Sequence, residues 1–91
     1  MKKYTVIWKP STEARLAELW TNNPKIRDDI TAASRTIDQA LAWIPADVGI
    51  SVSERARLIA IYPLAVLYLI HEMDRQVHVV NVDFWDQPRG S

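Results

Sequence analysis

Four side chains in this chain carry functional groups that could take part in catalysis or in binding an ion. His71 and His78 are its only histidines, and Arg55 and Arg57 alternate within one short segment. Histidine can shuttle protons or bind a transition metal, and arginine can bind phosphate oxygens. The two histidines flank the polar segment Glu72–Arg75, so a hairpin turn there would bring them together across two strands.

The same four residues also fit ordinary structural roles. Two histidines without a third ligand at a recognised spacing, in a chain without Cys, are more typical of a solvated hairpin than of a metal site. Arg55 and Arg57 fall on one face of a strand, where they could contact phosphate or a partner, or lie in solvent. We therefore predict no metal and no cofactor, and keep these four residues as the catalytic candidates.

The composition is that of one globular domain with no general attraction to nucleic acid. The chain has 91 residues, 48% hydrophobic and 24% charged, with eleven basic residues balancing eleven acidic ones. The longest apolar stretch, Leu58–Ile70, contains Pro63 and is shorter than the roughly 20 residues of a membrane span. The lack of Cys is compatible with a reducing compartment. We expect a cytoplasmic protein without a membrane segment.

The N-terminal half predicts one strand followed by two helices. Lys3–Lys9 is a strand, placed inside the sheet because both of its faces carry apolar residues. Pro10 ends it, and Ser11 or Thr12 is expected to cap the next helix. A second helix from about Lys25 to Trp43 has apolar residues at helical spacing and ends before Pro45. Trp20 and Trp43 lie on or beside the apolar stripes and are expected in the core.

The C-terminal half predicts three strands after the loop Ala46–Glu54. They are Arg55–Tyr62, Leu64–His71 and Val77–Trp85, rich in β-branched and aromatic residues. The order β-α-α-β-β-β predicts an α+β fold, with a helical hairpin on one face of a four-stranded, mainly antiparallel sheet. We expect one domain over residues 1–86 and a flexible tail over 87–91.

At this point the chain resembles the RelE/ParE superfamily of bacterial toxin–antitoxin modules. The likeness covers nearly the whole chain. It depends on YTVIWKPSTEARLAELW at the start, on the long helix ending at Ile44–Pro45, and on two strands. PLAVLYLI resembles the family's PYRVIYEI strand, and VHVVNVDFW resembles its closing VRVLRVxHxR strand.

The resemblance implies a small toxin that inhibits growth, as in plasmid stabilisation, and is neutralised by a cognate antitoxin. RelE-type members are ribosome-dependent mRNA endonucleases, and ParE-type members poison DNA gyrase. The nuclease cations are not matched here: Ala65, Asn81, Phe84 and Asp86–Gln87 stand where that branch has Arg, Arg, His and an Arg pair. This departure favours a ParE-like protein that acts by binding over an enzyme. A nuclease, or an inactive member that only holds its antitoxin, is the alternative.

The sheet face without helices is the predicted partner surface. It is expected to be covered by the antitoxin or by a second copy of the chain, because large apolar patches are rare on monomers. The expected contact residues, with the strand register left open, are Arg57, Val66, Tyr68, Phe84 and Trp85. Trp8 and Trp85 could line an aromatic groove there or belong to the core.

Overall fold

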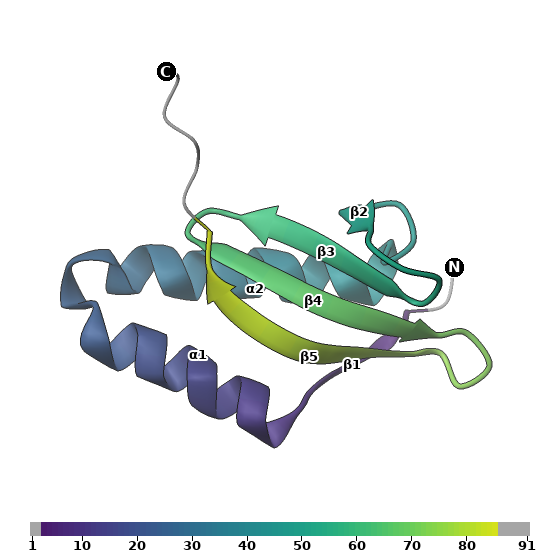
Figure 1. Cartoon of the computed structure of the whole chain (residues 1–91), viewed down its shortest axis with the longest axis horizontal. Coiled ribbons are helices and arrows are strands. Elements are labelled where there is room, and N and C mark those ends of the chain that lie inside the picture. The colour runs from purple at the N-terminus through teal and green to yellow at the C-terminus, as the bar shows by residue number, and fades with distance from the viewer. Residues whose placement is uncertain (1–2, 86–91) are drawn as a thin grey trace, which may run out of the picture.

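The computed structural model describes residues 3–85, so the tail expected over 87–91 lies outside the described residues. The elements are β1 (Thr5–Trp8), α1 (Pro10–Asn22), the 3₁₀ turn η1 (Pro24–Ile26), α2 (Arg27–Trp43), β2 (Ile50–Ser51), β3 (Ala56–Ile61), β4 (Leu64–His71) and β5 (Gln76–Phe84). Figure 1 shows the long α2 crossing behind the sheet.

The predicted α+β fold is confirmed, with a mixed sheet of five strands in place of four. The strand order is β1-β5-β4-β3-β2, with β1 parallel to β5 and the other pairs antiparallel. The added strand is β2, a two-residue pairing with β3 inside the segment predicted to be a loop. The interior position predicted for the first strand is wrong, because β1 pairs only with β5 and forms one edge.

The helices follow their apolar periodicity, although their ends differ from the prediction. In α2 the residues Ile30, Ala33, Ile37 and Leu41 are buried at helical spacing, as predicted. The expected cap of α1 by Ser11 or Thr12 is wrong. That helix begins at Pro10, which suits a first helical turn, and no side chain caps it.

The core lies between the helices and one face of the sheet. Its buried members are Leu19, Ile30, Ala33, Ile37, Leu41, Ile59, Leu64, Val66, Tyr68, Val77, Val79 and Val82. Alternate residues of β4 point into it, since Leu64, Val66 and Tyr68 are buried while the residues between them are half-exposed. The other sheet face carries no helix.

Two tryptophans expected in the core lie largely outside it. Trp20 is 41% exposed and Trp43 is 46% exposed. Neither residue is among the buried residues of its helix, which face the sheet. Trp20 covers part of the space between α1 and α2, and Trp43 lies near Lys3, whose ammonium is 6.0 Å from the ring centroid.

Tyr68 ties the core to the loop between α2 and β2. Its ring is completely buried, and its hydroxyl lies 2.7 Å from the carbonyl oxygen of Pro45 and 2.9 Å from that of Val48. Burial raises the pKa of this phenol, and the nearby Arg57 partly opposes the shift. The loop then turns through Gly49, whose φ of 68° favours glycine.

Candidate partner-binding surfaces

The uncovered face of the sheet, which we call the open face, presents apolar side chains in adjacent rows. The strand register aligns Ile50, Leu58, Leu67 and Asn81 in one row. The next row contains Ala56, Leu69, His78 and Ile7. Ile7 is 37% exposed, and the leucines of both rows are half-exposed. The apolar surface is therefore continuous over β2, β3 and β4, and His78 and Asn81 of β5 separate it from Ile7 of β1.

The strands that build the open face place no Lys or Arg on it within the described residues. Ala65 lies opposite Asp83 at the end where the nuclease branch has cations. Arg57 pairs in register with the buried Tyr68, so it lies on the opposite, helix-covered side. Arg55 precedes β3 and is exposed. The two arginines expected on one face of a strand are therefore not brought together on this surface.

Arg57 has a structural partner on its own side of the sheet. Its guanidinium nitrogens donate to the carbonyl oxygen of Val48 at 3.1 and 3.2 Å and to that of Gly49 at 3.2 Å. These contacts satisfy backbone acceptors of the α2–β2 loop. The arrangement holds the loop in place, and it leaves this cation away from the open face.

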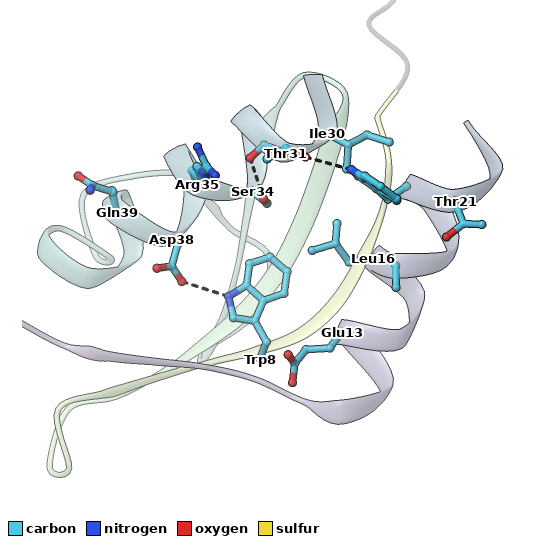
Figure 2. Close-up of a pocket in the computed structure, with 12 residues that line it drawn as sticks. Trp8, Glu13, Leu16, Thr21, Ile30, Thr31, Ser34, Arg35, Asp38 and Gln39 are labelled. Carbon is cyan, nitrogen blue, oxygen red and sulfur yellow. Dashed lines mark hydrogen bonds between the residues drawn. The ribbon is translucent and has the colours of Figure 1, made fainter. Parts of the chain in front are cut away.

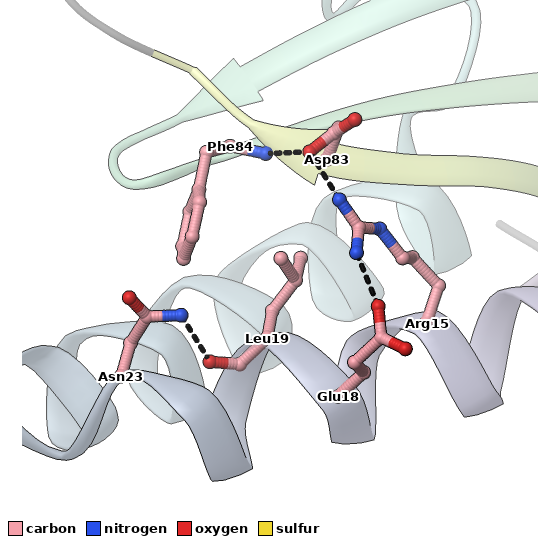
Figure 3. Close-up of polar contacts among 6 residues, drawn as sticks. All are labelled: Arg15, Glu18, Leu19, Asn23, Asp83 and Phe84. Atoms are coloured by element: carbon pink, nitrogen blue, oxygen red, sulfur yellow. Dashed lines mark hydrogen bonds and ion pairs between the residues drawn. The ribbon is translucent and has the colours of Figure 1, made fainter.

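The remaining predicted contact residues are spread over different environments. Val66 and Tyr68 are corrected to core positions, because both are completely buried beneath the helices and cannot reach a partner in the folded chain. Figure 3 shows Phe84 pointing from β5 towards the end of α1 that holds Leu19 and Asn23. Trp85 is half-buried, and its backbone N–H donates to the carbonyl oxygen of Pro63 at 2.9 Å.

An acidic side chain near the end of β5 is held by α1. Arg15 donates to Asp83 at 3.0 Å and also pairs with Glu18, as Figure 3 shows. The backbone N–H of Phe84 donates to Asp83 at 2.8 Å and, with Arg15, lowers the pKa of that carboxyl. The charge therefore stays on Asp83 at neutral pH, where the Arg15 guanidinium balances it.

A second surface feature is a groove of about 770 Å³ between α1 and α2. Figure 2 shows Trp8 and Leu16 pointing into it, with Glu13, Arg35 and Asp38 around it. The indole N–H of Trp8 donates to Asp38 at 3.2 Å, which fixes the ring in the groove. Of the two roles predicted for Trp8, an aromatic groove with Trp85 or the core, the structure agrees with the core, because Trp8 packs against it from the helix side.

Trp20 bridges the two helices at the same groove. Its indole N–H donates to the Thr31 hydroxyl at 3.1 Å, and the guanidinium carbon of Arg27 lies 4.1 Å from its ring centroid. That guanidinium also donates to the carbonyl oxygens of Trp20 and Thr21 at the end of α1. These contacts lock the helical hairpin, so the groove is a preformed feature.

The two histidines do meet across the β4–β5 hairpin, as predicted. Their ring centroids are 4.2 Å apart, and both lie on the open face near its end. The adjacent Glu72 is not part of this pair, because its carboxylate accepts a hydrogen bond of 2.6 Å from the Tyr4 hydroxyl. Residues 3–85 contain no cluster of three or more His, Cys, Asp or Glu placed to hold a metal ion.

Solved structures of the same shape come from toxin–antitoxin systems. A chain of the toxin–antitoxin complex RelBE2 from Mycobacterium tuberculosis matches with a TM-score of 0.76 and 21% identity, over 96% of this chain and 97% of that one. A chain of the chromosomal ParDE TA system from P. aeruginosa matches with a TM-score of 0.68 and 12% identity, over 91% of this chain and 97% of that one.

These matches define the fold class. The chain has the α+β fold of the RelE/ParE toxins, in agreement with the resemblance found in its sequence. No protein-family model and no curated protein sequence matches it. Among the described residues, no helix is long and apolar enough to cross a membrane.

Sequence reasoning missed the residues that define the open face. Leu58, Leu67 and Leu69 point to it, whereas Val66 and Tyr68 had been selected from the same strands. The strand β4 is apolar at every position before His71, so its composition does not reveal which alternate set faces the helices. The one useful signal was the phenol of Tyr68, which needs a buried hydrogen-bond partner and found it in the loop after α2.

Proposed function

We propose that this chain is the toxin-type component of a two-protein toxin–antitoxin module. In this proposal it acts by binding another protein, and a cognate antitoxin neutralises it by covering the open face. The observation that carries the proposal is the apolar surface formed by Leu58, Leu67 and Leu69 on the side without helices. The fold shared with chains of two toxin–antitoxin systems supports it.

The energetics of this surface favour a macromolecular partner. Fully burying a leucine gains roughly 1.5–3 kcal/mol, and these half-exposed leucines would each gain less. Several rows must therefore be covered together to offset the entropy lost on association. A segment that covers the strands from β1 to β3 would approach the roughly 800 Å² per partner of a standard specific interface. A small polar ligand would leave most of these leucines in contact with water.

Action by binding fits the charges better than nuclease action. Cleavage of a phosphodiester needs cations to stabilise the charge of the transition state, and an acid and a base to move protons. The open face carries no arginine or lysine on β3, β4 or β5, and Asp83 lies at the end where cations would be needed. This supports a ParE-like inhibitor of a protein target, such as DNA gyrase, over a RelE-like enzyme on the ribosome.

The proposal is tested by growth and by complex formation together. Induced expression of the chain in a bacterial host should arrest growth, and co-expression of the protein encoded by the neighbouring gene should restore it. Size-exclusion chromatography with light scattering should then show the two proteins in one complex. Arrest without ribosome-dependent mRNA cuts, read by primer extension, is the expected pattern.

Four outcomes would change this interpretation. Ribosome-dependent cuts that Arg57→Ala abolishes would replace protein binding with nuclease action. A stable complex without growth arrest would replace the toxin with a member that only holds its antitoxin. Failure of both growth arrest and complex formation would refute the module altogether. A homodimer in the absence of the partner would show that a second copy covers the open face.

A further inference from the structure

The two histidines packed on the hairpin combine two features of a metal-binding site. Leu69 lies opposite His78 and His71 lies opposite Gln76, so all four side chains project from the same face of the β4–β5 hairpin. The two imidazoles are already packed, with centroids 4.2 Å apart and ring planes tilted by 37°. Two imidazole rings that already pack against each other lose less side-chain freedom when an ion joins them.

Gln76 supplies a second and independent feature. Its side-chain oxygen lies 3.0 Å from Nε2 of His78. In the tautomer that a metal site requires, Nε2 of His78 donates to this oxygen and the lone pair is left on Nδ1. Histidines that bind metals commonly donate their other ring N–H to an oxygen in this way, which fixes the tautomer and the ring orientation.

The chemistry of the donors selects the kind of ion. Two neutral imidazoles with water completing the coordination suit late first-row divalent metals, and affinity for such sites follows the order Ni²⁺ < Cu²⁺ > Zn²⁺. Hard ions such as Mg²⁺ and Ca²⁺ prefer oxygen ligands and would bind poorly.

We propose that His71 and His78, with Gln76 orienting His78, form a binding site for a late first-row transition-metal ion, with Cu²⁺ bound most tightly. The site lies at the hairpin end of the open face, beside Ile7 and Leu69. It does not depend on the proposed toxin function, because it needs only the folded hairpin.

The test uses Cu²⁺, Ni²⁺, Zn²⁺ and Mg²⁺ with the intact chain. Isothermal titration calorimetry should give one Cu²⁺ per chain, weaker binding of Ni²⁺ and Zn²⁺, and none of Mg²⁺. In the NMR spectrum, Cu²⁺ should broaden the ring protons of both histidines together, and these are the only imidazole signals of the chain. His71→Ala and His78→Ala should each remove the tight site.

Two further variants test the orienting role of the amide. Gln76→Ala should weaken Cu²⁺ binding about 10-fold, the size expected for loss of a group that orients a metal ligand. Asn81→Ala, which changes an exposed polar residue elsewhere on the same strand, should leave binding unchanged. The proposal is overturned if the chain lacking both histidines binds Cu²⁺ as tightly as the unchanged chain. Equal affinity of the Gln76→Ala variant would remove the role given to the amide.

Discussion

Replacing Tyr68 by Phe tests whether this residue is a core anchor of the loop, as the structure places it, or a partner contact, as its sequence context suggested. The change removes one hydroxyl from a completely buried ring and leaves the ring in place. The hydroxyl has one hydrogen, and its closer acceptor is the carbonyl oxygen of Pro45 at 2.7 Å. The second acceptor, that of Val48, also receives the Arg57 guanidinium. The Pro45 carbonyl is therefore the group that loses its donor.

The expected cost follows from that single orphaned acceptor. A buried polar group left without a partner costs about 1–3 kcal/mol, and nothing else in the packing of Tyr68 changes. In a domain of this size each kcal/mol lowers the melting temperature by roughly 4–8 °C. The Tyr68→Phe chain should therefore remain folded but unfold at a clearly lower urea concentration and temperature.

The assay is urea unfolding followed by tryptophan fluorescence, with Tyr62→Phe as the matched control. Tyr62 is exposed, and Tyr62→Phe removes the same hydroxyl group at the surface. The free energy of unfolding of this control should therefore stay within about 0.5 kcal/mol of that of the unchanged chain. Equal midpoints for the two variants would refute the anchoring role. Loss of partner binding by a fully stable Tyr68→Phe chain would restore Tyr68 as a contact residue.

Three further changes address the loop, the β5 end and the core. Gly49→Ala should destabilise the fold by roughly 1–3 kcal/mol, because φ is +68° and a Cβ would lie 2.4 Å from a backbone oxygen of β3; thermal unfolding measures this. The pKa of Asp83 in the folded chain is below its ordinary value, first because of the Phe84 N–H and then because of Arg15. Charged Asp83 therefore stabilises the fold above about pH 4. This contribution is lost as the pH falls through the folded pKa. Asp83→Asn should therefore lower stability slightly at pH 7, with an effect below about 1 kcal/mol because the pair is exposed. The difference from the unchanged chain should shrink as the pH falls through the folded pKa, and no difference at any pH would show that the ion pair contributes nothing. Thr12→Val should raise stability by about 1 kcal/mol, since the Thr12 hydroxyl is buried and has no hydrogen-bond partner among the described residues; a lower urea midpoint would contradict this.

The sequence predicted the elements of the fold well because their signals are local. The apolar spacing of α2, and Pro10 as the residue expected to end the first strand, each act within a few residues. The His71–His78 contact was predictable because the turn between them is short and polar. The edge position of β1 was not, since it depends on pairing with β5, which lies at the other end of the sequence.

The candidate surface was harder to predict, for a physical reason. In β4, apolar residues occupy both faces, so the choice between Val66–Tyr68 and Leu67–Leu69 depends on which set the helices cover. That choice is fixed by packing against α2 and by the hydrogen bond of Tyr68 to the following loop. The exposure of Trp20 likewise depends on Arg27 and Thr31, which hold its ring between the helices.

The most direct test of the central claim measures the affinity of the partner encoded by the neighbouring gene for three lysine variants. Leu67→Lys places a charge in the middle of the open face, Ala17→Lys places one in the α1–α2 groove, and Met73→Lys changes the exposed hairpin tip. Each variant is first shown by circular dichroism to be folded. Burying an unpaired ammonium against leucines is costly, so Leu67→Lys should weaken binding at least 10-fold, or about 1.4 kcal/mol. The other two should bind within about 3-fold of the unchanged chain, an effect below 1.4 kcal/mol. Full affinity of Leu67→Lys, with the loss confined to Ala17→Lys, would contradict the claim and place the partner between the helices.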